Sequence, residues 1–289
     1  MPNLKTIRKR IQAVKGTQQL TRAMKLVAAA KLRRAQEAAL AQRPYEESLV
    51  EVIHHLAQRV EEGAHPLVAT RPVRKVLLLL YSSDRGLCGS FNLNVCRAFE
   101  NYHKENAGKL DEIGLAVIGK KGFEFLSRRS YKVSHHYRDM FADTTFDRVS
   151  RIGNELAQEF VDGGYDALYV VYNWFKSAVV QKVRFERILP MELPETQTNG
   201  PHSHVEHLFE PDRKSLLDTL FPMYVNMCIY QALLESVASE MGARMTAMDN
   251  ATNNAGDLIR RLTLIYNKAR QDTITKELMD IVGGANAVS

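Results

Sequence analysis

The chain has 289 residues, a net charge of +6, 45% apolar residues and 25% charged residues. This composition is typical of a folded globular protein and excludes disorder along the whole length. The sequence has no uncharged apolar run of about 18 residues and no apolar stretch after its first residues, so we expect neither a membrane span nor a secretory signal. Its three cysteines, Cys88, Cys96 and Cys228, are too few for a disulfide framework and favour a reducing compartment.

The positive charge is confined to the first fifth of the chain. Residues 1–60 carry 12 basic and 4 acidic side chains, whereas residues 61–212 carry 19 and 21, and residues 213–289 carry 8 of each. This shift in composition indicates separate structural parts. A cationic arm can also bind phosphate backbones, so a coiled-coil nucleic-acid binder is one function to consider, although no aromatic residue is interleaved with these cations before Tyr45.

Residues 1–60 are expected to form an N-terminal coiled-coil helix. They consist mainly of Ala, Leu, Lys, Arg, Gln and Glu, which are strong helix formers. Steps of three and four residues from Leu4 follow one helix face, apolar at first and then polar, which is typical of a coiled-coil seam with a polar patch. We expect Pro44 to kink or restart the helix because it lacks a backbone donor. The seam positions are Leu4, Ile7, Ile11, Val14, Gln18, Thr21, Lys25, Ala28, Leu32, Ala35 and Ala39.

Residues 70–192 have the pattern of a Rossmann-like α/β domain. Short apolar runs predict strands over 73–81, 113–118 and 132–136, and helical stretches cover 92–106, 121–129 and 146–162. Residues 167–175 and 178–188 alternate in polarity and predict an antiparallel pair. The alternation of strand and helix therefore indicates a parallel sheet with this hairpin at one edge, followed by a loop over 193–211.

Two segments of this domain have features of ligand sites. Gly114, Gly119 and Lys120 have the spacing of a phosphate-binding loop, but Lys121 stands where a hydroxyl residue would hold Mg²⁺, and residues 115–118 lie inside a predicted strand. Residues 84–92 follow a strand at the place where doubly wound sheets bind ligands, and Cys88 could be a nucleophile there. No His lies nearby in the sequence, so a tight turn around a packed cysteine is the better interpretation.

We expect no metal site and no cofactor. His202, His204 and His207 could contact a metal, but their loop offers no further Cys and no spacing typical of a structural site.

Residues 212–289 predict a second, longer coiled-coil helix. A single seam of alternating steps runs through seven heptads, and Gly283-Gly284 is expected to end it. From residue 222 to 282 such a helix would be about 90 Å long, too long to be buried within a globule of this size, so we expect it to project as an antiparallel coiled coil with the first segment. The seam positions are Leu220, Tyr224, Met227, Gln231, Leu234, Ala238, Met241, Met245, Met248, Thr252, Ala255, Ile259, Leu262, Tyr266 and Ala269.

These features leave three function classes open. The first is a mechanical or interaction protein with a two-helix stalk. The second is an α/β nucleotide-binding enzyme with a helical oligomerisation arm, and the third is the nucleic-acid binder. The residues by themselves predict no catalytic constellation.

Motifs along nearly the whole chain resemble the gamma subunit of F-type ATP synthases. The most specific are TQQLTRAMKLVAA at 17–29, SDRGLCGSFN at 83–92 and YNKARQDTITKELMDIVGGA at 266–285. The resemblance implies a non-catalytic central stalk, or rotor, that couples rotation of the membrane c-ring to ATP synthesis and hydrolysis in the alpha–beta catalytic ring. It implies the alpha, beta and epsilon subunits and the c-ring as partners, no nucleic acid, and a peripheral position on the cytoplasmic face of the bacterial inner membrane.

The resemblance also assigns contact residues by motif position. Substitution of Met24 by Lys is expected to place a cation beside Arg270 and to degrade coupling while the subunits still assemble. No counterpart of the regulatory cysteine pair of the chloroplast form lies between Leu193 and Pro211, so thiol control is not expected. Beta-subunit contacts are implied at Met24, Arg244, Arg270, Gln271, Thr275 and Glu277, and c-ring contacts at His207, Leu208, Phe209 and Glu210.

Overall fold

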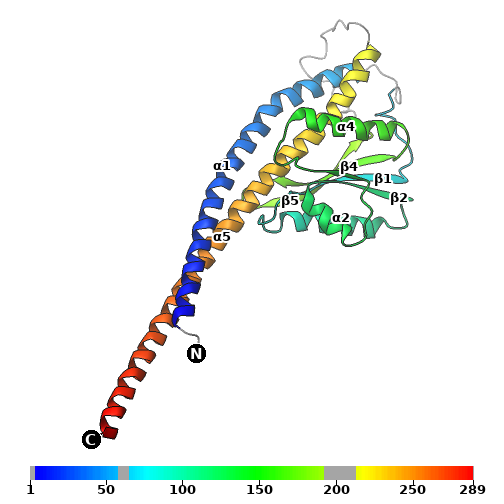
Figure 1. Ribbon diagram of the computed structural model, residues 1–289. Coiled ribbons are helices and arrows are strands. Elements are labelled where there is room, and N and C mark those ends of the chain that lie inside the picture. Colours follow the sequence, from blue (N-terminus) through cyan, green and yellow to red (C-terminus); the bar gives the residue numbers. More distant parts are fainter. Residues whose placement is uncertain (1–3, 58–64, 192–212, 289) are drawn as a thin grey trace. The chain divides into compact units, whose positions relative to one another are not determined.

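The computed structural model describes residues 4–57, 65–191 and 213–288, which fall into two compact units (Figure 1). Unit 1 combines the described residues up to Ala29 with those from Arg244 onward, and unit 2 runs from Ala30 to Ala243. Helix α1 (Leu4–Ala57) and helix α5 (Arg213–Val288) contribute to both units. The predicted α/β class with long terminal helices is confirmed.

Unit 1 is an antiparallel pair formed by the first half of α1 and the second half of α5. Thr21 contacts Thr252 and Lys25 contacts Asp249, so the residue number rises on one helix as it falls on the other. Every predicted seam position of α1 is buried or half-buried, and among the other residues from 4 to 40 only Met24 and Ala29 are. The heptad pattern therefore identified the face by which α1 packs.

Both helices continue through residues that were expected to interrupt them. α1 passes Pro44 without restarting, and α5 begins at Arg213 and continues through Gly283 and Gly284 to Val288, so the predicted helix end at Gly283 is wrong. Pro44 is exposed, which lets water reach the carbonyl that the missing N–H leaves unpaired. Leu49 and Ile53, buried one to two turns later, anchor the helix beyond the proline.

Unit 2 contains a five-stranded sheet in the order β3-β2-β1-β4-β5. The pairs β1–β2, β1–β4 and β2–β3 are parallel, and β4–β5 is the antiparallel edge hairpin that the sequence predicted. The uninterrupted apolar run of β1 is buried on both faces, as expected of a central parallel strand. The strands are β1 (Lys75–Tyr81), β2 (Glu112–Ile118), β3 (His135–Tyr137), β4 (Ala167–Phe175) and β5 (Gln181–Leu189).

Helices cover both faces of this sheet (Figure 1). α2 (Phe91–Asn106) and α3 (Lys120–Ser127) pack on the face of Val76, Leu78 and Leu80. α4 (Phe146–Val161) and the first part of α5 lie on the opposite face, where the Tyr81 hydroxyl reaches α5. None of the described helices contains a stretch long and apolar enough to span a membrane.

Candidate functional site

The polar patch predicted on α1 forms hydrogen bonds across unit 1. The Thr21 and Thr252 hydroxyl oxygens are 2.8 Å apart, and Thr252 Oγ1 also donates to the carbonyl of Met248. Gln18 Nε2 donates to the Thr252 carbonyl at 3.4 Å, and Lys25 Nζ lies 2.6 Å from Asp249 Oδ1. We call Gln18, Thr21, Lys25, Asp249 and Thr252 the polar layer. These polar groups are paired with one another, so the patch belongs to the helix interface.

The contact residues implied by the resemblance lie at two levels of unit 1. Met24 is half-buried next to the polar layer, and Arg270 is exposed. With Thr21 opposite Thr252, Met24 and Arg270 are separated by about 30 Å along the pair at 1.5 Å per residue. A lysine at position 24 would therefore lie near Asp249 and not beside Arg270, which corrects that expectation. Gln271, Thr275 and Glu277 are exposed like Arg270, and Arg244 is half-buried.

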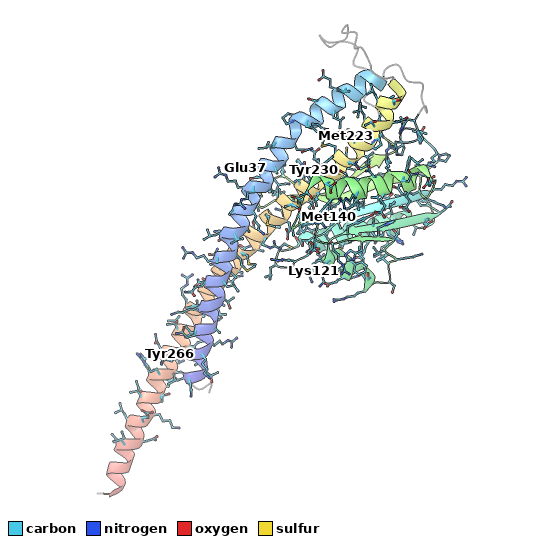
Figure 2. The ribbon with its side chains drawn as sticks, turned by 45° about the horizontal axis from the view of Figure 1, so that its top comes forward. Glu37, Lys121, Met140, Met223, Tyr230 and Tyr266 are labelled. Carbon is cyan, nitrogen blue, oxygen red and sulfur yellow. The ribbon has the colours of Figure 1, made fainter. Side chains whose placement is uncertain are left out.

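The last part of α5 has an exposed apolar surface. Every residue from Arg270 to Val282 is exposed, because the described part of α1 ends near the level of Ala269. Apolar residues so exposed on one helix mark an interaction surface. Figure 2 labels Tyr266, which is half-buried just before this segment. The exposed apolar residues are Ile274, Leu278, Met279, Ile281 and Val282.

Within unit 2, α5 is joined to the α/β domain by buried hydrogen bonds. The Tyr81 hydroxyl donates to the Ile229 carbonyl at 2.9 Å, and Ser239 Oγ donates to the Asn173 carbonyl at 2.7 Å. Burial raises the pKa of the Tyr81 hydroxyl well above its usual range, and the neighbouring Tyr172 adds to this. The sheet thus holds α5 through hydrogen bonds that are shielded from water.

α4 also contacts α5 closely, at a glycine. Gly153 faces Asn226, where an added Cβ would overlap the side-chain oxygen, and Asn226 Nδ2 donates to Asn154 Oδ1 at 2.9 Å. The ring of Tyr230, labelled in Figure 2, meets Phe146 edge-on at 5.5 Å. Sequence reasoning missed this junction. The available signal was the glycine in the middle of a predicted helix, which often marks close packing.

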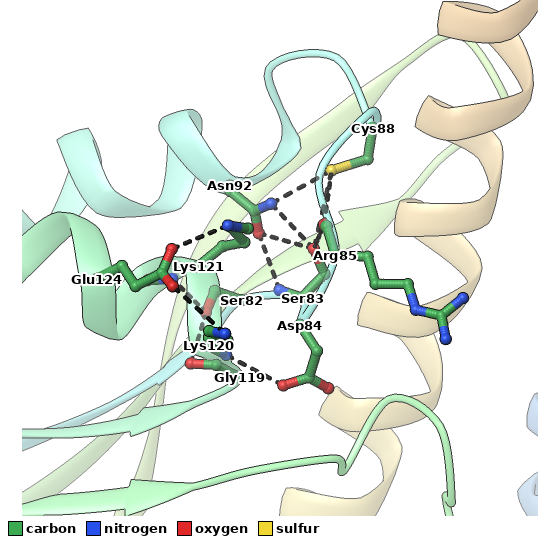
Figure 3. A network of polar contacts seen from close by, with 11 residues as sticks. Ser82, Ser83, Asp84, Arg85, Cys88, Asn92, Gly119, Lys120, Lys121 and Glu124 are labelled. Atoms are coloured by element: carbon green, nitrogen blue, oxygen red, sulfur yellow. Dashed lines mark hydrogen bonds and ion pairs between the residues drawn. The ribbon is translucent and has the colours of Figure 1, made fainter.

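The carboxyl end of β1 carries a closed network of polar contacts (Figure 3). Asn92 Oδ1 accepts from the Ser83 N–H at 2.8 Å, and Asn92 Nδ2 donates to Ser83 Oγ at 2.9 Å. Lys121 Nζ lies 2.8 Å from Glu124, and this bond lowers the pKa of the Glu124 carboxyl. Asn92 of α2 therefore stabilises the β1–α2 turn, and Lys121 and Glu124 form an ion pair within α3.

In the phosphate-loop-like segment, the backbone N–H groups that would bind a phosphate are already paired. Residues 115–118 lie in β2, as predicted, and the first N–H groups of α3 are taken by the β1–α2 turn. Lys120 N–H donates to Asp84, Lys121 N–H to the Ser83 carbonyl and Gly122 N–H to Ser82 Oγ. A helix N-terminus binds phosphate through these groups when they are unpaired. The geometry thus argues against the nucleotide-binding alternative.

Cys88 is packed inside the tight turn, as we expected when we preferred a structural role over a nucleophilic one. It is buried, and Asn92 Nδ2 lies 3.3 Å from its sulfur. Ser83 Oγ and the Arg85 carbonyl lie 3.8 Å away, and none of these three groups takes a proton from a thiol at neutral pH.

The loop that carries the implied c-ring contacts lies outside the described residues. This applies to His207, Leu208, Phe209 and Glu210, and to the other two histidines of that loop. In the described ranges, no group of His, Cys, Asp or Glu side chains could hold a metal ion.

Comparison with known proteins identifies the family to which this chain belongs. The sequence matches the family described as ATP synthase over residues 3–288. It is 46% identical over 290 aligned residues to the ATP synthase gamma chain of Geobacter sp. (strain M21), covering all of this chain and 99% of that one. It is 43% identical to the gamma chain of Anaeromyxobacter sp. (strain K), with full coverage of both chains. The chain belongs to the ATP synthase gamma chain family.

Solved structures share the fold. A chain in the central stalk and c-ring structure of Tetrahymena thermophila mitochondrial ATP synthase is 25% identical with a TM-score of 0.62, covering 80% of this chain and 99% of that one. A chain in a Euglena gracilis mitochondrial ATP synthase structure is 19% identical with a TM-score of 0.69, covering 99% and 94%; this second likeness concerns the fold alone.

Proposed function

We propose that this chain is the rotor of an F-type ATP synthase, coupling rotation of the membrane c-ring to ATP synthesis or hydrolysis in a ring of alpha and beta subunits. The proposal is based on the antiparallel pair of helices in unit 1. In this pair, α5 continues beyond the described part of α1 as a single exposed helix that carries apolar residues. Membership of the ATP synthase gamma chain family supports this proposal, in which other subunits surround the exposed helix.

The proposed coupling follows from the asymmetry of the helical pair. A shaft with two helices at one level and one helix at another presents a different surface to each of several equivalent sites around it. The nucleotide affinity of each site then depends on the angle of the shaft, which is a coupling free energy between rotation and binding. In this proposal the subunit itself catalyses nothing and the nucleotides bind to its partners.

We further propose the partners and the location. The alpha and beta subunits would surround α5 and contact Met24, Arg244, Arg270, Gln271, Thr275 and Glu277. The α/β domain would bind the epsilon subunit and rest on the c-ring, with the contact at residues 207–210. The complex would lie at the cytoplasmic face of a bacterial inner membrane, with this subunit peripheral to it.

Site-specific photo-cross-linking tests the proposal. A photoreactive amino acid at Gln271, which is exposed, is expected to cross-link to the alpha or beta subunit in a co-expressed, ATP-hydrolysing complex. The control places it at Lys104, an equally exposed position on α2, and no alpha or beta product is expected there. Absence of the chain from any ATP-hydrolysing complex, or identical products at both positions, would contradict the proposal.

Met24→Lys tests the implied shaft contact, with the position of Met24 corrected. The new ammonium would lie beside the Lys25–Asp249 pair and compete for Asp249. We expect normal assembly and ATP hydrolysis but less proton pumping per ATP, measured in vesicles. Met24→Leu keeps the half-buried apolar contact and should pump like the parent. Unchanged pumping in Met24→Lys would show that position 24 does not act in coupling.

A further inference from the structure

The polar layer interrupts a seam that is otherwise mostly apolar. Ile7 is buried on one side of it and Ala28 on the other, and across the pair Ala255 and Met248 flank Thr252. Two of these four neighbours, Ala28 and Ala255, are small and bury little apolar area. The polar bonds between the helices are therefore the specific contacts at this level.

The layer forms its bonds between the two helices only in the observed alignment. Thr21 is 8% exposed and its hydroxyl meets Thr252. A slip of one heptad would place Thr21 opposite Met245 or Ile259, and would place Lys25 opposite a glycine, Gly242 or Gly256. Each hydroxyl would keep the bond to its own helix, Thr21 to the Gln18 carbonyl and Thr252 to the Met248 carbonyl. The bonds between the helices and the Lys25–Asp249 pair would be lost, so the observed register is favoured over its neighbours. Buried polar residues in coiled coils are known to set register in this way.

We propose that the polar layer is a register lock, formed by positioning residues that fix how α1 and α5 align in unit 1. The mechanical consequence rests on the proposed function. A lock against sliding keeps each residue of α1 opposite the same residue of α5, so that the surface of the pair at each level stays the same as it turns.

Distance measurements on the full chain test the lock. Spin labels at Gln12→Cys and Arg261→Cys occupy exposed positions of unit 1; Cys228 is replaced by Ala, and the buried Cys88 and Cys96 are kept. The double variant Thr21→Val/Thr252→Val keeps the side-chain shape but removes both hydroxyls. We expect a broader interlabel distribution, with a component displaced by up to about 10 Å, the rise of one heptad. The thermal midpoint should be unchanged or higher.

A matched control uses the same substitution on the same two helices. Thr17 and Thr263 are exposed, and their hydroxyls donate to carbonyls of their own helices, those of Ala13 and Ile259. Thr17→Val/Thr263→Val should therefore leave the distribution narrow. Lys25→Asp should broaden it by placing two acids together, and Lys25→Asp/Asp249→Lys should narrow it again by restoring an opposite pair.

The outcomes separate the lock from the proposed function. An unchanged distribution in Thr21→Val/Thr252→Val, or equal broadening in Thr17→Val/Thr263→Val, overturns the lock. These distances are measured on the chain alone. Failure to join an ATP-hydrolysing complex would thus remove the proposed function, while the interlabel distances would still decide the lock.

Discussion

Two stretches of α5 have opposite surroundings. No residue from Val225 to Met241 is exposed, whereas every residue from Arg270 to Val282 is. Both stretches contain apolar residues at helical spacing, but the first is packed against other parts of unit 2 and the second has no described neighbour at its level. Tertiary packing stabilises the first stretch. The second depends on helix propensity and, in our proposal, on partner subunits.

The largest expected effect is a cavity in the buried stretch. Leu233 is 0% exposed, so Leu233→Ala should lower the free energy of unfolding by about 2–5 kcal/mol. Urea unfolding followed by circular dichroism measures this. Leu264→Ala is the matched control, because Leu264 is 71% exposed on the same helix, and a change of less than about 0.5 kcal/mol is expected there. Similar losses in both variants would contradict the expected difference between buried and exposed positions of α5.

The next effect concerns the close approach of α4 to α5. Gly153→Ala would push a methyl group into Asn226 Oδ1, and overpacking of this kind costs about 1–3 kcal/mol. Asn226→Ala added to Gly153→Ala should recover part of that loss by making room for the methyl group. Thermal unfolding of the single and double variants measures the coupling between them. If Gly153→Ala left the stability unchanged, the two helices could move apart without losing free energy of folding.

A smaller effect is expected from the hydroxyl that joins the sheet to α5. Tyr81→Phe should cost about 1 kcal/mol at pH 7, the net value of one hydrogen bond. Because the folded state raises the pKa of Tyr81, its contribution is complete below the unfolded value near 10 and is lost as the pH rises above it. Alkaline unfolding should thus be less steep in Tyr81→Phe than in the parent. Identical slopes above pH 10 would contradict this.

The smallest effect on stability belongs to the exposed stretch. Leu278 is 57% exposed, so Leu278→Ala should change the unfolding free energy of the chain by less than about 0.5 kcal/mol. In the assembled complex, however, we expect less proton pumping per ATP, because in our proposal a partner subunit buries this side chain. Thr273→Ala, exposed on the same stretch and hydrogen-bonded to its own helix, is the control. Equal pumping by parent and Leu278→Ala would place Leu278 outside the contact.

Local pattern was a good guide where one side chain type repeats along one face. The heptads identified the buried face of α1 residue by residue, including the half-buried Gln18 and Lys25. They could not give the partner of each position. The expectation that position 24 lies beside Arg270 failed because the alignment of two helices depends on pairs more than 200 residues apart in the chain.

Local sequence signals were weaker guides where the tertiary environment decides whether a helix continues or whether backbone N–H groups are free. Pro44 was expected to kink or restart the first helix, and Gly283 to end the second. The first helix does not restart at Pro44, and the second continues through Gly283. The spacing around Gly119 resembled a phosphate loop, and only the fold revealed that the β1–α2 turn occupies the N–H groups at the start of α3.

The sequence by itself determined that this chain has two long terminal helices and a mainly parallel α/β domain between them. Helical and strand periodicity depend only on the order of residues within one segment, so they can be recognised without knowing the fold. Tertiary structure alone decided the register of the helical pair, the closed network at the carboxyl end of β1 and the junction of Gly153 with Asn226. Each of these is a contact between residues distant in the chain, and its energy exists only once folding has brought both partners together.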